Sequence, residues 1–386
     1  MDEVRNILER GVADFAPSPD ALGRTLRRVR RRQWGRRAAA AGAAVMVAGG
    51  LVAGLWTGFR PAQRSPVIRP TPSPSPEGRI EGQRPVALGD GSVWAITCDR
   101  RCGNDGRLAQ GRLLRIDPTT QRLVASVPTG PTQAVAVGEV GVWFIDFWHG
   151  TVTRVDPATN RVVATIPLRL PFPVCQCPGA RDFLPFDLTT GAGAVWVITD
   201  RGAVARVDPG TNRVAAYIRI PGENCGGIAV AGDRVWVTNC VFGVLAIDPA
   251  TNSVSEKGPI VHGHHRIGAE SLLTADGALW AAGANVRKTG DPANPFTFLR
   301  GGAVARIDPA RGHITATFDF DHSAFLAAAD RNAVWVAAGR DRFYRIDTGT
   351  SDVSGPFSLG GMLWAARDGS GWVVTTDGAL QQVPLP

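Results

Sequence analysis

Several short motifs that mark common catalytic sites are missing from this sequence. Its 386 residues contain no G-x-S-x-G nucleophile elbow, no glycine-rich phosphate loop and no H-E-x-x-H zinc motif. Lysine is almost absent as well, since Lys257 and Lys288 are the only lysines among 42 basic residues. The sequence therefore gives no motif-based support for a serine hydrolase, a P-loop nucleotide-binding enzyme or a zinc peptidase.

Positive charge is concentrated at the start of the chain. The formal net charge is +8, but residues 1–37 hold ten arginines against five acidic residues and supply about five of these charges. The rest of the chain is mildly basic and has no basic stripe interleaved with aromatic residues. We therefore expect no nucleic-acid binding.

An uncharged apolar run follows the arginines. Residues 38–59 carry no charged side chain and are long enough to cross a bilayer as one helix. Eight arginines lie within residues 24–37, on one flank only, which by the positive-inside rule places the N-terminus in the cytoplasm. The sequence predicts a cytoplasmic segment at 1–37 and a single-pass transmembrane helix at 38–59. A cleaved signal peptide is the alternative, although its charged region would be unusually long and no cysteine closely follows the run for lipid attachment.

Residues 60–78 are rich in proline and serine. Such a composition does not form a packed core and is typical of a semi-rigid, extended spacer. We expect this segment to hold residues 79–386 away from the outer surface of the membrane.

A tryptophan-centred apolar strand recurs seven times after residue 79, at Trp94, Trp143, Trp196, Trp236, Trp280, Trp335 and Trp372. Six copies are followed by a second strand that ends in aspartate, at Asp117, Asp156, Asp208, Asp248, Asp308 and Asp347. With one short strand before the tryptophan and one after the aspartate, each unit has four strands in about 40 to 55 residues. This pattern predicts an all-β fold, a seven-bladed β-propeller with four-stranded antiparallel blades, preceded by the transmembrane helix.

The repeated residues are explained by structure. The tryptophan strands are apolar on both faces, so we expect them to be buried between adjacent blades. The Asp-Pro-x-Thr-Asn segments have turn chemistry, since aspartate and threonine cap backbone groups, proline fixes φ and asparagine tolerates a left-handed conformation. A calcium site is the alternative, but the aspartates belong to separate blades, whereas a calcium loop gathers its ligands.

The last unit has only three strands, and the unassigned segment GRIEGQ, residues 78–83, precedes the first. We expect this segment to pair into the last blade, which would close the ring and remove an open sheet edge.

The segments VWVTN at 235–239 and RVDPATNRVVATI at 154–166 resemble the YVTN-type β-propeller repeats, a group that is also similar to the bacterial virginiamycin B lyase propellers. The resemblance covers about 300 residues and implies the propeller fold. Such propellers include lyases, periplasmic proteins and the extracellular sensor parts of membrane receptors, so the resemblance implies no single activity.

Function is expected where the repeats differ. The connections between the third and fourth strands are nearly uniform, whereas those at the opposite end of the blades vary in length and chemistry. We predict that this variable end binds a ligand through Asp146, Trp148, His149, Asp182, Asp200, Arg201, Asn239, His264, His265, Arg287 and Arg340.

All six cysteines fall at the variable end, and outside a membrane cysteines usually form disulfides. Cys225 begins the first strand of the fourth unit and Cys240 ends the second, so an antiparallel hairpin would bring them together. The other four, Cys98, Cys102, Cys175 and Cys177, allow three pairings. The most local one joins Cys98 to Cys102 and Cys175 to Cys177, but a Cys-x-Cys disulfide is strained and cross-pairing stays open.

The preferred interpretation is a binding or sensing scaffold for a protein, glycan or other envelope ligand, with no catalytic residue, no cofactor and no metal. Histidines and cysteines are zinc ligands, but the spacing typical of a tetrahedral zinc site is missing. The alternative is an enzyme similar to virginiamycin B lyase, with a divalent cation in the channel and His149 or His265 as the base. The expected location is the cytoplasmic membrane, with the propeller outside and monomeric.

Overall fold

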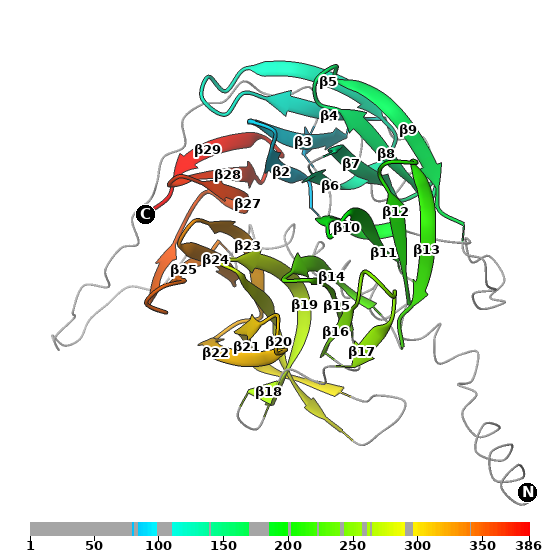
Figure 1. Cartoon of the computed structure of the whole chain (residues 1–386). Helices are drawn as coiled ribbons and strands as arrows, with labels where there is room; N and C mark the ends of the chain where they lie inside the picture. Colours follow the sequence, from blue (N-terminus) through cyan, green and yellow to red (C-terminus); the bar gives the residue numbers. More distant parts are fainter. Residues whose placement is uncertain are drawn as a thin grey trace, which may run out of the picture. The chain divides into compact units, whose positions relative to one another are not determined.

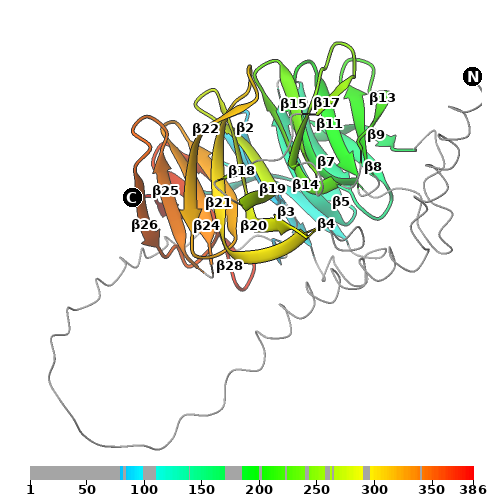
Figure 2. The same cartoon turned by 90° about the horizontal axis from the view of Figure 1, so that it is seen from below.

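The computed structural model describes residues 79–80, 84–98, 110–138, 140–169, 185–199, 202–221, 224–239, 243–256, 261–262, 265–289, 296–339 and 341–386. These residues form seven antiparallel sheets arranged as the blades of a propeller (Figures 1 and 2). The predicted all-β, seven-bladed fold is confirmed. The predicted cytoplasmic segment, transmembrane helix and spacer lie outside the described residues. Within the part that is described, no helix has the length and apolar character needed to cross a membrane.

The innermost strands of blades 1 to 7 surround the centre of the ring, and each contacts the next, including the last with the first (Figure 1). They are β2 (Val86–Gly89), β6 (Thr132–Gly138), β10 (Pro185–Gly191), β14 (Asn224–Ala231), β19 (His265–Ala275), β23 (Ala324–Asp330) and β27 (Gly361–Arg367). The second strands carry the tryptophans and are β3 (Ser92–Cys98), β7 (Gly141–Asp146), β11 (Ala194–Thr199), β15 (Arg234–Asn239), β20 (Ala278–Lys288), β24 (Ala333–Ala338) and β28 (Ser370–Thr375).

In the six blades with a fourth strand, the repeated aspartate ends the third strand or directly follows it. They are β4 (Gly111–Ile116), β8 (Thr151–Asp156), β12 (Ala203–Asp208), β16 (Gly243–Ile247), β21 (Phe296–Asp308), β25 (Phe343–Asp347) and β29 (Leu380–Pro384). The outer strands are β5 (Leu123–Thr129), β9 (Arg161–Pro167), β13 (Arg213–Arg219), β17 (Val254–Glu256), β22 (His313–Phe320) and β26 (Val353–Phe357). Two further strands, β1 (Arg79–Ile80) and β18 (Val261–His262), join blades 1 and 5.

Antiparallel pairing gives each blade two different ends. We call one end the turn face: it holds the hairpin turns between innermost and second strands and between third and outer strands. We call the other end the loop face: it holds the connections from second to third strands and from each outer strand to the next blade. The variable segments of the sequence belong to the loop face.

The tryptophans form the packing between blades. All seven indoles are buried, and every residue of β3, β7, β11 and β24 is buried as well. Trp94 of blade 1, for example, belongs to one apolar cluster with Val135 and Phe144 of blade 2. The prediction that these strands are covered on both faces is confirmed.

An arginine on the third strand connects several blades to their neighbours. Arg154 pairs in register with Trp143, places its guanidinium 5.6 Å from the centre of that ring, and donates to the Pro209 carbonyl of blade 3 at 2.7 Å. It also donates to the Asn212 side chain at 3.1 Å. Arg115 and Arg206 make the same contacts to the next blade. Gln382 holds this register position in blade 7 and accepts a 3.0 Å hydrogen bond from Gln121 of blade 1.

The six aspartate segments form the predicted turns. In five of them the aspartate Oδ1 accepts hydrogen bonds from two backbone N–H groups of its own turn, as Asp208 does from Gly210 and Thr211, and Asp156 Oδ1 accepts one from Ala158. Asn160, Asn212 and Asn252 adopt the left-handed conformation, with φ between 53° and 58°. These backbone donors lower the pKa of Asp156, Asp208 and their four equivalents. The turn prediction is confirmed.

The expected closure of the ring was wrong. Blade 7 contains three strands, and β1 pairs with blade 1, where Arg79 lies opposite Cys98 and Ile80 opposite Thr97. The reason is that β3 is longer than β2, so its last residues would otherwise present unpaired backbone groups. A single backbone bond, from Ile80 N to Gly378 O at 2.9 Å, and a bond from Arg79 to the Thr376 carbonyl link this segment to blade 7.

Blade 5 differs from its neighbours at the loop face. Two of the variable segments, residues 258–268 and 283–302, contain paired strands in their described parts. The second of them lengthens β20 and β21 to 11 and 13 residues, whereas β7 and β8 have six each. Pairing continues from Gly283 opposite Ala303 to Lys288 opposite Phe296. The variable segment that precedes blade 5 folds back on itself, so that β18 pairs with the start of β19.

Candidate functional site

The loop face of blade 2 carries a paired aspartate and histidine. Asp146 ends β7, and its Oδ2 lies 2.7 Å from His149 Nδ1. Its Oδ1 accepts hydrogen bonds from the backbone N–H groups of Trp148 at 2.9 Å and His149 at 3.0 Å. The Asp146 side chain is 9% exposed and that of His149 is 56% exposed. The structure thus brings together three residues that the sequence predicted as ligand-binding.

This pair fixes the orientation of the imidazole ring. With Nδ1 as the donor to the carboxylate, Nε2 of a neutral imidazole keeps a lone pair that can accept a hydrogen bond. A Cβ atom at Gly130 would lie 2.3 Å from Asp146 Oδ2, so a side chain at this position would displace the carboxylate. The arrangement can bind a hydrogen-bond donor or remove a proton from a bound molecule.

A second charged pair connects three blades at the centre of the ring. Arg84 precedes β2, and its backbone bonds to the free edge of β6, with Arg84 N to Gln133 O at 3.2 Å and Val135 N to Arg84 O at 3.0 Å. Its guanidinium continues to β10 in blade 3, where Nη2 lies 3.0 Å from Asp187 Oδ2. The entry of the chain into blade 1 is therefore attached to blades 2 and 3.

The Asp187 carboxyl is buried, with 6% of its side chain exposed. Burial raises its pKa from 3.8 to about 6, although the Arg84 charge and the backbone N–H of Leu188 act in the opposite direction. Burial prevails because Arg84 is itself one-third exposed and supplies the only opposite charge that lowers this pKa. We interpret this pair as structural, because the guanidinium and the carboxylate bind each other.

The other predicted ligand-binding residues are dispersed. Asn239 ends β15, is buried, and donates to the Pro221 carbonyl at 2.6 Å, so its amide holds the start of blade 4. Arg287 is exposed on the extended part of β20, opposite Thr297. His265 begins β19. The remaining predicted residues lie outside the described part of the chain: Asp182, Asp200, Arg201, His264 and Arg340.

Cys98 ends β3 at the loop face and is disulfide-bonded. Cys225 lies on β14, one residue after Asn224, which is paired with Asn239. Cys102, Cys175, Cys177 and Cys240 lie outside the described residues, so the predicted pairings, including Cys225 with Cys240, stay predictions.

Among the residues with described side chains, no three histidine, cysteine, aspartate or glutamate groups lie close enough together to hold a metal ion. Asp146 and His149 together would offer a metal ion two ligands.

Sequence reasoning missed the Arg84 and Asp187 pair. A signal was present: Asp187 interrupts the innermost strand PFDLTTG at a level where blades 2 and 4 have the apolar segments AVAV and GIAV. A charged residue on such a strand requires a partner, and Arg84 is the arginine nearest the start of β2.

Comparison with solved structures supports the fold alone. The chain is similar to a structure of the mitotic checkpoint complex, with a TM-score of 0.59, 10% identity, and 89% of this chain and 99% of that chain covered. It is similar to hydrazine synthase of Kuenenia stuttgartiensis, with a TM-score of 0.56, 12% identity, and 85% and 99% covered. It is also similar to BBS1N in complex with ARL6DN, with a TM-score of 0.53, 14% identity, and 84% and 98% covered. No protein-family model matches the chain, and no curated protein matches its sequence.

Proposed function

We propose that this chain is a membrane-anchored propeller of the YVTN type that binds a protein or glycan of the cell envelope outside the cytoplasmic membrane. The anchoring rests on the arginine-flanked apolar run at 38–59. The binding role rests on the propeller scaffold, whose loop face collects the irregular parts of the repeat. Two of the similar structures are parts of protein complexes, an analogy at the level of fold that favours a protein partner.

The extension of blade 5 carries this proposal. The strands β20 and β21 continue past the level at which neighbouring blades end, and their yellow ends project from the ring in Figure 1. Phe298 lies on this extension with 60% of its surface exposed, and Arg287 and Arg300 are exposed beside it. An exposed aromatic residue and arginines on a rigid strand pair are the residue types that dominate protein-binding hot spots.

A photocrosslinking experiment tests this role. The full-length chain is expressed in its native cells with benzoylphenylalanine in place of Phe298, and with the same residue at Val163 as a control. Val163 is half exposed, but it lies on the outer strand β9, away from the loop face. We expect a discrete covalent adduct from position 298 that Arg287→Glu weakens. Equal adducts from positions 298 and 163, or none from 298, would contradict the proposal.

The Asp146 and His149 pair favours a second candidate, an enzyme similar to virginiamycin B lyase with His149 as the base. The 2.7 Å contact and the exposure of His149 are the specific observations in its favour. If this candidate is correct, His149→Ala abolishes cyclic-ester cleavage by the purified chain in the presence of Mg²⁺, and Asp146→Asn lowers its rate. Absence of turnover in the parent chain would eliminate it.

A further inference from the structure

The innermost strands of blades 6 and 7 break the repeat at the turn face. In blades 1 to 5 the last residue of this strand is small: Gly89, Gly138, Gly191, Ala231 and Ala275. The residue before it is larger: Leu88, Val137, Thr190, Val230 and Thr274. At the same register positions, blade 6 has Ala329 and Asp330, and blade 7 has Ala366 and Arg367.

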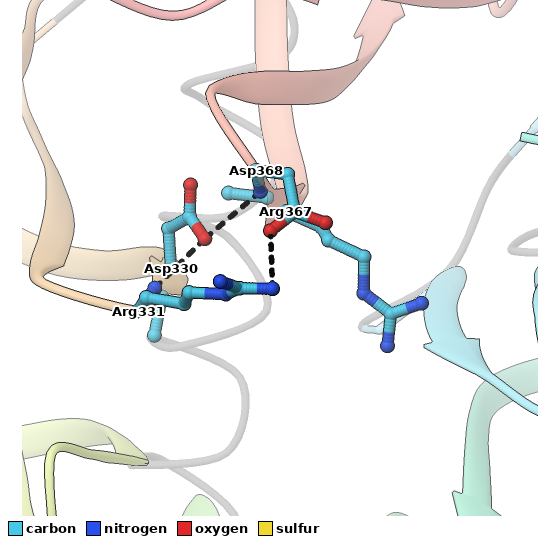
Figure 3. Close-up of a pocket in the computed structure, with 6 residues that line it drawn as sticks. Asp330, Arg331, Arg367 and Asp368 are labelled. Carbon is cyan, nitrogen blue, oxygen red and sulfur yellow. Dashed lines mark hydrogen bonds and ion pairs between the residues drawn. The ribbon is translucent and has the colours of Figure 1, made fainter. Parts of the chain in front are cut away.

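In the regular blades the larger side chain covers the small residue of the preceding blade. A Cβ atom at Gly89 would lie 2.4 Å from Val137, and one at Gly138 would lie 2.8 Å from Thr190. Ala366 is too small to cover Asp330 in this way. A depression of about 520 Å³ results, lined by Ala329, Asp330, Arg331, Ala366, Arg367 and Asp368 (Figure 3). Its volume lies in the usual range for small-molecule sites.

Three of the four charged groups in this depression hold one another. The Asp330 carboxylate accepts hydrogen bonds from the backbone N–H groups of Arg331, Asp368 and Gly369 at 2.7 to 3.0 Å. Arg331 Nη2 lies 3.1 Å from Asp368 Oδ1. The bonds from Asp368 and Gly369 and the pair of Arg331 with Asp368 cross between the two blades, and the side chains of Arg331 and Asp368 are themselves exposed.

Arg367 is the exception. Its guanidinium extends away from the other three charged groups (Figure 3), and no hydrogen bond or ion pair joins it to any residue that the structure describes. A guanidinium presents a planar fork of donors that matches a carboxylate. The two aspartates retain lone pairs that can accept hydrogen bonds from hydroxyl groups.

We infer that the depression between blades 6 and 7 binds a hydroxylated carboxylate of the size of a hexuronic acid. Arg367 holds the carboxylate, Asp330 and Asp368 accept hydroxyl groups, and the small side chain of Ala366 leaves the space for the ring. The site lies on the turn face, so it is separate from the loop-face binding proposed above, and either can fail alone. The ligand comes either as a free sugar acid or as a uronic acid unit of a polysaccharide.

Calorimetry on the purified full-length chain in detergent tests the site, with glucuronate, a glucuronate oligosaccharide and glucose as probes. We expect glucuronate to bind with a Kd of about 1 mM, given a ligand of this size. Glucose, which lacks the carboxylate, should bind at least tenfold more weakly. Tenfold tighter binding of the oligosaccharide would identify a polysaccharide as the source, and equal binding a free sugar acid.

Two variants locate the binding. Arg367→Gln should weaken glucuronate binding at least tenfold, whereas Arg213→Gln, at an exposed arginine on β13, should not change it. Ala366→Val gives blade 7 the side chain that blades 2 and 4 have at this register position, and should abolish binding without lowering the Tm. No binding of glucuronate at 10 mM, equal binding of glucose, or full binding by Arg367→Gln would overturn the inference.

Discussion

The guanidinium of Arg84 lies 3.0 Å from the buried carboxylate of Asp187, which belongs to the blade two positions further around the ring. Because Arg84 also pairs through its backbone with blade 2, one residue connects three blades at the point where the chain enters the propeller. Removing this side chain would leave a buried charge without its partner.

We expect Arg84→Gln to lower the free energy of unfolding by about 1–3 kcal/mol at pH 7.5, measured by denaturant titration. The control is Arg234→Gln. Arg234 Nε lies 3.7 Å from Oδ1 of Asp233, whose side chain is exposed. A surface pair of this kind contributes about 1 kcal/mol or less. Equal effects of the two substitutions would show that the central pair has no special role.

The raised pKa of Asp187 predicts an unusual pH dependence. A carboxyl group with a pKa of about 6 in the folded chain and 3.8 in the unfolded chain binds more protons when folded. Its contribution is fully present below pH 3.8 and is lost as the pH rises through about 6, by at most about 3 kcal/mol. Asp187→Asn should remove this loss between pH 4 and 7, and parallel stability profiles of the two proteins would contradict the assignment.

The turn aspartates should change stability with pH in the opposite direction to Asp187. Backbone N–H groups lower the pKa of Asp208 and its equivalents, so their contribution is present above pH 3.8 and is lost as the pH falls through the lowered values. We expect Asp208→Asn to flatten the acid limb of the unfolding curve below pH 4, measured by circular dichroism. An unchanged acid limb would show that these turns do not depend on the charge.

The contact of Arg154 with the next blade predicts a loss of stability at a surface-accessible position. Arg154→Gln keeps a polar side chain but removes the stacking over Trp143 and the bonds to Pro209 and Asn212. We expect a loss of about 1–2 kcal/mol in denaturant titration. Arg161→Gln, on the exposed outer strand β9, is the control and should change stability by less than about 0.5 kcal/mol.

Much of the fold could be predicted because each repeated residue belongs to a short sequence pattern. Trp143 and its equivalents identify the buried second strand, and Asp156 with Asn160 identifies the turn that follows the third strand. Each of these residues recurs within a short and recognisable sequence pattern, so the pattern is sufficient to count seven blades.

The features that escaped prediction depend on distant partners or on register. The segment at Arg79 and Ile80 pairs with blade 1 only because β3 is longer than β2, and Arg84 finds a partner about a hundred residues away. The depression between blades 6 and 7 depends on Ala366 being smaller than its equivalents in the regular blades, which becomes visible only after the strands are aligned in register. Asp146, Trp148 and His149 do lie together, because one short turn contains all three, and their predicted role in ligand binding stays a prediction.

A topology experiment tests the central proposal most directly. Alkaline phosphatase, which is active only outside the cytoplasm, and green fluorescent protein, which fluoresces only inside it when exported unfolded, are each fused after Pro386 of the full chain. We expect phosphatase activity without fluorescence, and deletion of residues 38–59 should reverse both signals. A fluorescent fusion of the intact chain with inactive phosphatase would place the propeller in the cytoplasm and contradict an envelope-binding role.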